Sequence, residues 1–226
     1  MNKQEIQINT EDFPEELLHL FKNAKIYDSS SNPTARVLYS DGGCYIKIAE
    51  KGMLQRESAL AEIFESKGIG AHVITYISDD KDYLVTESVK GEDATHYLED
   101  PERLCGVFAE AMKYLHSLSV RDIPVSPCME QYDALEEGRK LKKDTLIHGD
   151  FCFPNIMMDH WKFSKFIDLG LAGVGDRHID IYWLLWSLQY NLKTDRYADC
   201  FLDLYGRENV DEEILQIVTE VEKEAM

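Results

Sequence analysis

The sequence lacks paired cysteines and long hydrophobic runs. Its five cysteines are odd in number and widely scattered, and no two of them form a C-x-x-C pair. Neither a disulfide framework nor a zinc site is therefore indicated. The most apolar stretch, IDIYWLLWSL, is too short to span a bilayer, and the first residues, MNKQEIQINTEDF, contain no apolar run of a signal peptide. We expect a cytoplasmic protein with no membrane partner.

Positive charge is also scarce. The 226 residues include 24 Lys and Arg against 42 Asp and Glu, which gives a formal net charge of -18 at pH 7. Binding to a phosphate backbone requires a basic surface, so a nucleic-acid partner is not expected. Such a field would raise the local concentration of a small cationic molecule, although net charge alone more often serves solubility. We expect a small cationic ligand, and a chain that acts as a monomer or weak dimer.

The residue periodicity changes near residue 90. Before it, residues 35–49 and 72–89 each indicate two short strands around a polar turn, and residues 55–70 have the spacing of a helix that ends at glycine. Beyond it, helical spacing dominates, and helices are expected over residues 101–119, about 179–192, 195–205 and from 211 onward. The second of these is expected to begin at Asp176 or Asp180. The pattern predicts an α+β protein with a small antiparallel β-sheet domain containing one helix, residues 1–88, and a larger, mainly helical domain, residues 89–226.

A group of polar residues interrupts the short apolar runs of residues 146–170, LIHGDFCFPNIMMDHWKFSKFIDLG. Asp150, Asn155 and Asp168 each lie at or just beyond the end of such a run, where side chains leave the core but stay firmly held. Together they offer the oxygen ligands that Mg²⁺ prefers, with one carboxylate left to take a proton. A single residue of this kind would indicate only a turn. The ordered set indicates a catalytic centre.

These residues form the pattern H-x-D-x-x-x-x-N, followed by a strand that ends in D-x-G. The pattern resembles the catalytic loop and the metal-binding Asp of protein-kinase-like phosphotransferases. The form HGDFCFPNIMM and FIDLG is more similar to the aminoglycoside 3'-phosphotransferase branch, the antibiotic kinases. The resemblance covers nearly the whole chain. It implies a bilobal protein-kinase-like fold, in which residues 1–88 bind the nucleotide and residues 89–226 form the catalytic and substrate-binding lobe.

The resemblance also implies roles for residues of the catalytic region. Asp150 would be the catalytic residue that accepts or orients the proton of a substrate hydroxyl, while Asn155 and Asp168 would hold Mg²⁺ across the ATP phosphates. His148 and Asp180 would be structural supports of the loop. His116, which also recurs in the family, is better explained as a satisfied core residue.

Further implied residues lie in the first domain. Lys47 in CYIKIA would bind the α- and β-phosphates, and Glu57 would hold the flexible lysine stem in place. Tyr45 would stack on the nucleotide base, although burial in a strand explains it equally well. Backbone groups near Glu87 and Val89 would bind the adenine edge. The implied cofactors are ATP, with GTP possible, and Mg²⁺.

Three parts of the sequence depart from the family pattern. The segment that would cover the phosphates, SSSNPTARV, contains no glycine, so Ser29 to Ser31 with Asn32 would supply donors instead. The segment between Ser119 and His148 is shorter than the family's substrate-binding insertion, and its remnant MEQYDALEEGRKLKKD is expected to form at most one amphipathic helix. Leu171 follows IDLG where many of these enzymes have Arg. All three concern ligand-binding parts.

Acidic residues remain where a cationic substrate could meet them. Those on the remnant and at the end of the chain are Glu130, Asp133, Glu136, Glu137 and Glu222. A run of charge is usually only a solvated helix face.

The expected function is therefore an ATP- and Mg²⁺-dependent transfer of phosphate to a hydroxyl of a small cationic antibiotic, with an aminoglycoside as the first choice and antibiotic resistance as the role. One alternative is a kinase of the same fold that acts on a metabolite, such as a choline-like or amino-sugar alcohol. A second is a non-catalytic homologue that only binds a nucleotide or ligand. The presence of Lys47, Glu57, Asp150, Asn155 and Asp168 argues against this second alternative.

Overall fold

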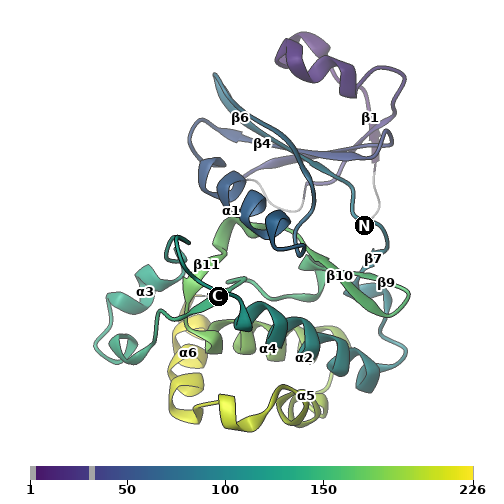
Figure 1. The fold of residues 1–226 in the computed structure, drawn as a ribbon. Helices are drawn as coiled ribbons and strands as arrows, with labels where there is room; N and C mark the ends of the chain where they lie inside the picture. The colour runs from purple at the N-terminus through teal and green to yellow at the C-terminus, as the bar shows by residue number, and fades with distance from the viewer. Residues whose placement is uncertain (1–3, 31–33, 226) are drawn as a thin grey trace. The chain divides into compact units, whose positions relative to one another are not determined.

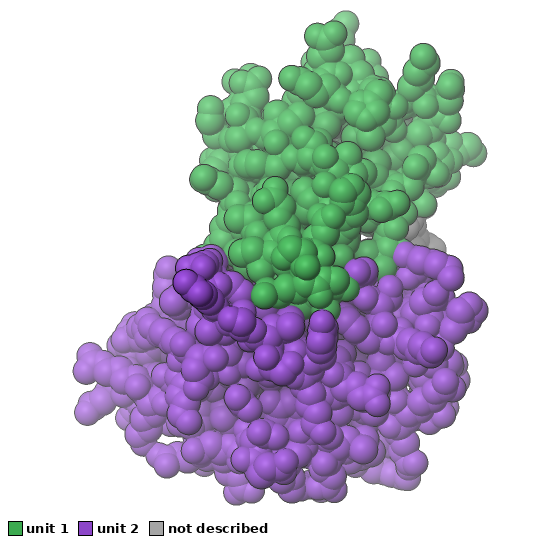
Figure 2. All heavy atoms as spheres, in the orientation of Figure 1, with its two compact units in different colours: residues 1–89 green, residues 90–226 purple. Residues whose placement is uncertain are grey.

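The computed structural model describes residues 4–30 and 34–225. The chain divides into two compact units, residues 1–89 and residues 90–226 (Figure 2). Ser31 and Asn32, two of the residues considered for phosphate contact, lie outside the described residues.

The first unit is built on a six-stranded antiparallel sheet with the strand order β1-β2-β3-β4-β6-β5. Its strands are β1 (Gln4–Ile6), β2 (Ile26–Asp28), β3 (Arg36–Ser40), β4 (Cys44–Glu50), β5 (Val73–Ser78) and β6 (Lys81–Glu87). The two hairpins expected from the alternating pattern are present as β3–β4 and β5–β6. The sequence pattern did not predict β1, β2 or the 3-10 helices at Thr10–Asp12 and Glu15–Leu20.

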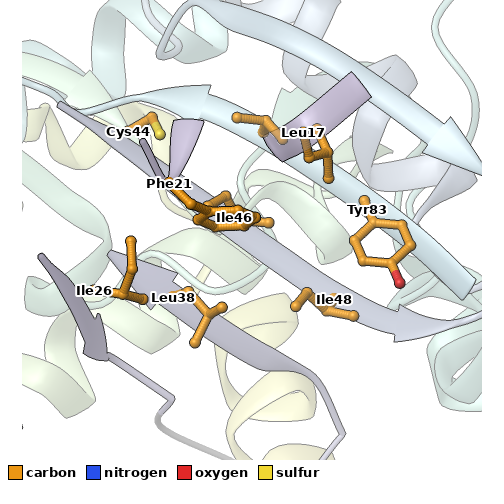
Figure 3. Packing of buried hydrophobic residues seen from close by; sticks show 9 residues of the cluster. Leu17, Phe21, Ile26, Leu38, Cys44, Ile46, Ile48 and Tyr83 are labelled. Atoms are coloured by element: carbon orange, nitrogen blue, oxygen red, sulfur yellow. The ribbon is translucent and has the colours of Figure 1, made fainter. Parts of the chain in front are cut away.

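Alternation along β4 separates the core side chains from the polar ones. Cys44, Ile46 and Ile48 are buried in a hydrophobic cluster with side chains of β3, β6 and the N-terminal segment (Figure 3). Because successive side chains of a strand point to opposite faces, Tyr45 and Lys47 are directed to the other face. Both are only partly buried.

The α-helix α1 (Gln55–Ser66) confirms the helix expected from residue 55. It buries Leu60, Ala61 and Phe64, which recur at helical spacing. The amide of Leu54, just before the helix, donates to the buried carboxylate of Asp82 at 2.8 Å. This bond ties the start of α1 to β6.

The second unit is mainly helical (Figure 1). Its helices are α2 (Pro101–Ser117), α3 (Met129–Asp133), α4 (Arg177–Leu192), α5 (Tyr197–Tyr205) and α6 (Glu212–Ala225), with 3-10 helices at Ala94–His96, Glu137–Lys140, Phe153–Asn155, Leu169–Leu171 and Arg207–Asn209. Its short strands are β7 (Glu92–Asp93), β8 (Thr145–Ile147), β9 (Ile156–Asp159), β10 (Lys162–Phe166) and β11 (Gly173–Gly175). The strands form two small sheets, β10-β9-β7 and β11-β8.

The start of α4 shows which of the two expected aspartates caps the helix. Asp176 is the cap, and its carboxylate accepts a hydrogen bond from the amide of His178 at 3.0 Å. Asp180 lies one turn into the helix and is completely buried, so it is available for a different contact.

The segment between α2 and β8 differs from the single amphipathic helix that its sequence allows. It forms the short helix α3 and then a separate 3-10 turn at Glu137–Lys140. A Cβ atom at Gly138 would lie 2.1 Å from the carbonyl oxygen of Tyr132. The chain folds back on α3 at this glycine, and a continuous helix is therefore broken.

No helix in the described ranges, 4–30 and 34–225, combines the length and apolarity needed to cross a bilayer.

Candidate active site

The loop that follows β8 is held in place by hydrogen bonds to one buried carboxylate. Asp180 accepts hydrogen bonds from the amide of His148 at 2.9 Å and from the amide of Gly149 at 2.8 Å. Strand β8 is itself fully buried and pairs with β11. The backbone at the start of the loop is thus fixed before any polar side chain projects from it. The family resemblance implies a supporting role of this kind for Asp180.

Gly149 is required by the path of the loop. Its φ of 81° lies in the left-handed region, and a Cβ at this position would approach the carbonyl oxygen of Leu171 to 2.3 Å. The Leu171 carbonyl also accepts the hydroxyl of Ser126 at 2.7 Å. The loop and the segment after Asp168 therefore meet at a point where only glycine fits.

The ring of His148 is committed to hydrogen bonds within the fold. Nε2 lies 3.0 Å from the carbonyl oxygen of Ile167, which can only accept, so Nε2 carries the proton and Nδ1 is an acceptor. Nδ1 accepts the amide of Asp150 at 3.3 Å. The buried ring thus connects the loop to the strand end before Asp168, a geometry suited to support rather than to proton transfer.

Asp150 and Asn155 are joined directly. The amide nitrogen Nδ2 of Asn155 donates to Oδ2 of Asp150 at 2.8 Å and to the Asp150 carbonyl oxygen at 3.0 Å. Asn155 is buried, whereas Asp150 is partly exposed. Because Nδ2 faces Asp150, the amide oxygen Oδ1 is the atom of this side chain that could ligate a metal ion. One carboxylate oxygen of Asp150 is thereby oriented by the protein itself.

Asp168 lies next to this pair in the fold although it is distant in sequence. It follows β10 and has a left-handed backbone, with a φ of 58°. The amide of the preceding Ile167 donates to the carbonyl oxygen of Asn155 at 3.1 Å. The exposed Asp168 is therefore placed beside the Asp150 and Asn155 loop by a backbone bond.

Two cysteines beside the loop are not nucleophiles. Burial raises the pKa of Cys128 to about 11 and raises the pKa of Cys152 above its ordinary range. Both thiols therefore stay protonated at neutral pH, and a thiol is weakly nucleophilic in that form. The Cys128 thiol lies 3.6 Å from the Gly149 carbonyl oxygen, where it acts as a weak donor.

The first unit contains an ion pair between Lys47 and Glu57. Nζ of Lys47 lies 2.9 and 2.8 Å from the two carboxylate oxygens of Glu57. The side chains are 22% and 10% exposed, respectively, so the pair is shielded from water without being sealed from a ligand. The bidentate contact fixes the lysine stem between β4 and α1.

Three other residues are expected to contact a nucleotide: Tyr45, Glu87 and Val89. The rings of Tyr45 and Tyr39 lie 4.9 Å apart between centroids. The amide of Glu87 donates to the His72 carbonyl at 2.8 Å, which leaves the carbonyl oxygen of Glu87 as its backbone group for an adenine edge. Val89 is the last residue of the first unit.

The acidic residues considered for a cationic substrate do not share one environment. Glu130, Glu136 and Glu137 are exposed, and Asp133 is exposed but lies 2.6 Å from Nζ of Lys143.

Glu222 is buried, unlike a residue of a solvated helix face. It accepts hydrogen bonds from the hydroxyl of Tyr132 at 2.5 Å and from Nε2 of Gln131 at 2.8 Å. Glu222 is buried because it lies on the inner face of α6, one turn after the buried Val218. Its carboxylate is used within the fold, and we do not retain it as a substrate contact.

The sequence did not indicate one connection to the loop. The side chain of His116 is only 3% exposed, as expected of a core residue, but its ring lies between the Asp180 carboxylate at 3.1 Å and the Tyr205 hydroxyl at 2.8 Å. Tyr205 is separated from His116 by 89 positions, and no local pattern links two residues so far apart.

The composition of the site suits only certain metal ions. Within the described part of the chain, no group of three His, Cys, Asp or Glu side chains is placed to hold a metal. Magnesium typically uses one or two carboxylates, completed by waters and substrate phosphates. An Asn oxygen with one carboxylate therefore fits a magnesium nucleotide and does not fit a self-contained zinc site.

Comparison with solved structures assigns the class of the fold. An aminoglycoside phosphotransferase of Streptomyces rimosus, solved with ADP and streptomycin, aligns with a TM-score of 0.70 over 96% of this chain and 98% of that chain, at 19% identity. A second phosphotransferase, solved with GDP and kanamycin, aligns with a TM-score of 0.65 over 91% of this chain and 85% of that chain, at 14% identity. The chain therefore has the fold of these phosphotransferases.

Sequence comparison is more specific. The phosphotransferase enzyme family matches residues 127–215. A probable aminoglycoside 3'-phosphotransferase of Lactococcus lactis is 41% identical over 253 residues, covering 96% of this chain and 97% of the relative. The chain belongs to the aminoglycoside phosphotransferase family, and it is a phosphotransferase enzyme. Because the alignment is longer than the 226-residue chain, the relative carries residues that this chain lacks.

Proposed function

We propose that this enzyme transfers the γ-phosphoryl group of ATP to a hydroxyl group of an aminoglycoside antibiotic, with Asp150 as the catalytic residue. The observation that carries the proposal is the direct bond from Asn155 to Oδ2 of Asp150, on a loop whose backbone is held by Asp180. The family relationship supports the substrate class, because its named members are aminoglycoside phosphotransferases.

Asp150 has the properties that the proton step requires. Its second carboxylate oxygen is not bonded to Asn155, and the side chain is partly exposed, so a substrate hydroxyl can reach it. The carboxylate would accept or orient the hydroxyl proton while the hydroxyl oxygen attacks the γ-phosphorus. Phosphoryl transfer depends mainly on positioning and charge neutralisation, and a rigid loop supplies the positioning.

Oδ1 of Asn155 and the carboxylate of Asp168 would hold magnesium. When bound, the ion would neutralise charge on the nucleotide phosphates. The amide of Ile167, the residue before Asp168, donates to the carbonyl oxygen of Asn155, and this proximity of the two backbones supports a shared role.

Lys47 of the first unit would bind the phosphates of ATP. Its ammonium is a point charge on a flexible stem, and the bidentate contact with Glu57 removes much of that freedom before a ligand arrives. The carbonyl of Glu87, the backbone of Val89 and the ring of Tyr45 would contact the base. Relatives have been solved with ADP and with GDP, and we propose ATP as the donor here. Because ATP is made available in the cytoplasm, we place the enzyme there.

The proposal is tested by measuring ADP release with Mg-ATP against a panel of aminoglycosides and of amino alcohols, in the wild type and in Asp150→Asn. Amide for carboxylate keeps the size of the side chain and removes the proton acceptor. We expect kcat with an aminoglycoside to fall by about 10²–10⁴-fold, the range contributed by a positioned acid or base. The dissociation constant of ATP should be nearly unchanged.

Asp122→Asn is the matched control, because its side chain is 89% exposed and the left-handed backbone at this position accepts Asn readily. It should behave as the wild type. Turnover on amino alcohols and on no aminoglycoside would replace the proposed substrate. Activity that survives Asp150→Asn would refute the proposed mechanism.

A further inference from the structure

A polar pocket of about 240 Å³ lies in the second unit, beside α2, the start of α4 and the end of α5. It is lined by Lys113, His116, Ser117, Arg177, Tyr205 and Asn209. None of these side chains is a carboxylate, and Lys113, Arg177 and Asn209 each carry N–H donors. In a chain with a formal charge of -18, a pocket without an acidic lining residue and with two cationic ones is unusual.

The two cationic residues of the pocket lack acidic partners. Among the described residues, no carboxylate oxygen lies within 4.0 Å of Lys113 or Arg177, although many other basic residues form such pairs. Arg177 lies against the Tyr205 hydroxyl, and Lys113 is exposed. Their positive charge is therefore not cancelled locally by the protein.

Two buried acids that interact electrostatically with Tyr205 are already occupied. Asp180 accepts the amides of the catalytic loop and the ring of His116. Asp176 accepts the amide of Lys142 at 2.7 Å and the ring of His178 at 2.6 Å. Both carboxylates are buried, and neither lines the pocket.

A chain of hydrogen bonds connects the pocket wall to the catalytic loop. Nε2 of His116 carries a proton because its partner, the Asp180 carboxylate, can only accept, so Nδ1 is free to accept the Tyr205 hydroxyl. Burial raises the pKa of Tyr205 to about 12, so its hydroxyl keeps the proton that it donates. The chain then continues from Asp180 to the amides of His148 and Gly149.

We propose that this pocket binds an oxyanion of the phosphate class, inorganic phosphate or a small phosphomonoester, and that its occupancy is transmitted to the catalytic loop through Tyr205, His116 and Asp180. The hydroxyls of Ser117 and Tyr205 already donate to the Tyr114 carbonyl and to His116, so the anion would be held by the cations Lys113 and Arg177 and by the Asn209 amide. The several N–H donors of these three groups match the acceptor oxygens of a tetrahedral anion better than the two of a carboxylate. The pocket holds the volume of several waters, at about 30 Å³ each, so a phosphate with bound water or a short ester fits.

Binding is tested by calorimetric titration of the ADP-saturated enzyme with inorganic phosphate and, separately, with glycerol phosphate. We expect saturable binding of at least one of them. Lys113→Gln and Arg177→Gln should each weaken it by about tenfold, the effect of losing one charged hydrogen bond. The control Lys142→Gln removes an exposed charge outside the pocket and should leave the affinity unchanged.

The two ligands distinguish the source of the phosphate group. Binding of the ester alone would identify an ester site, and binding of both would identify a general phosphate site. If neither ligand binds, or if Lys113→Gln and Arg177→Gln bind as tightly as the wild type, the pocket is not an anion site. None of these readouts depends on transfer activity, so failure here is separate from failure of the proposed function.

Transmission is tested by hydrogen exchange at the amides of His148 and Gly149. The bound anion would hold Arg177, which lies against the Tyr205 hydroxyl, so we expect slower exchange at both amides when the phosphate ligand saturates the wild type. Tyr205→Phe removes the hydroxyl that reaches His116, so the ligand should still bind but exchange should no longer respond. A wild-type loop whose exchange is unaffected, or an equal response in Tyr205→Phe, would contradict the coupling.

Discussion

At the residue scale, buried carboxylates organise the second unit, and each has a different set of partners. Asp180 holds the catalytic loop, Asp176 caps α4, and Glu222 joins α6 to α3. A buried carboxylate is costly unless it is hydrogen-bonded. Asp176 and Glu222 show the two outcomes of this balance.

The pKa values of these two carboxyls are shifted in opposite directions. Burial acts to raise the pKa of Asp176, but the hydrogen bonds from His178 and from the amide of Lys142 outweigh it and lower the pKa. At Glu222 burial dominates over the bonds from Tyr132 and Gln131, and the pKa is raised above 4.5. Of the two, only Glu222 makes a contribution to folding stability that is lost as the pH increases.

We predict that Glu222→Gln changes how stability depends on pH. The folded state binds the Glu222 proton more tightly than the unfolded state, so this stabilisation is complete below pH 4.5 and is lost as pH rises through the folded-state pKa. Glutamine lacks the titration, and it can still accept the Tyr132 hydroxyl. Between pH 4.5 and pH 7.5 the free energy of unfolding should shift in favour of the variant relative to wild type, as measured by urea unfolding.

Glu220→Gln provides the comparison on the same helix, because Glu220 is exposed. Its curve should run parallel to that of the wild type. A parallel curve for Glu222→Gln would show that this carboxyl does not titrate differently on folding.

At the scale of elements, the segment from α3 to β8 is where this chain departs most from its expected local structure. Its sequence allows one amphipathic helix, but Gly138 brings the backbone against Tyr132 and produces a short helix followed by a 3-10 turn. The buried side chains Met129, Tyr132 and Leu141 then pack in one cluster with α4 and α6. The fold-back, rather than helix propensity, decides the shape of this segment.

We predict that Gly138→Ala destabilises the protein, because its Cβ would meet a backbone oxygen at 2.1 Å and the turn must shift. Overpacking of this kind costs about 1–3 kcal/mol. The matched control is Gly106→Ala within α2, where an added Cβ has no atom within 4 Å. Alanine there should stabilise the protein by about 0.5–1 kcal/mol. Urea unfolding of both variants measures the difference, and equal effects of the two substitutions would contradict the role of the fold-back.

At the scale of the whole molecule, the dominant property is the net charge of -18. A field of this sign attracts cationic molecules and is weakened by salt. Glu130, Glu136 and Glu137 are exposed on the α3 segment, in the region where relatives of this family carry additional residues by our sequence interpretation. Neutralising them tests whether they add a local contribution.

We predict that replacing Glu130, Glu136 and Glu137 together by Gln raises KM for an aminoglycoside by about threefold or more, since each exposed ion pair contributes about 0.2–1 kcal/mol. KM for ATP should not change. The effect should diminish in high salt, and steady-state kinetics at two ionic strengths measures it.

The control for this variant neutralises three exposed acids of the first unit, Glu62, Asp79 and Asp80. It makes the same change in net charge at another surface. Equal effects of the two triple variants would assign the increase in KM to net charge alone, and no effect of either would remove the acids from substrate binding.

Local patterns were sufficient wherever the determining forces are local. The hairpin of β3 and β4 follows from alternation around Asp41 to Gly43, and α1 follows from the spacing of Leu60 and Phe64. Strands β1 and β2 were not predicted, because each has only three residues and depends on pairing with a neighbour for its stability.

By itself, the sequence determined the order of the polar residues Asp150, Asn155 and Asp168, the family to which they point and the change from a β-rich to a helical unit. Only the tertiary structure decided that Asn155 bonds to Asp150, that Glu222 is buried and that Tyr205 reaches His116. The physical reason is that propensity and periodicity act over a few residues. A hydrogen bond between residues as many as 90 positions apart, such as that of Tyr132 with Glu222, exists only after the whole chain has packed.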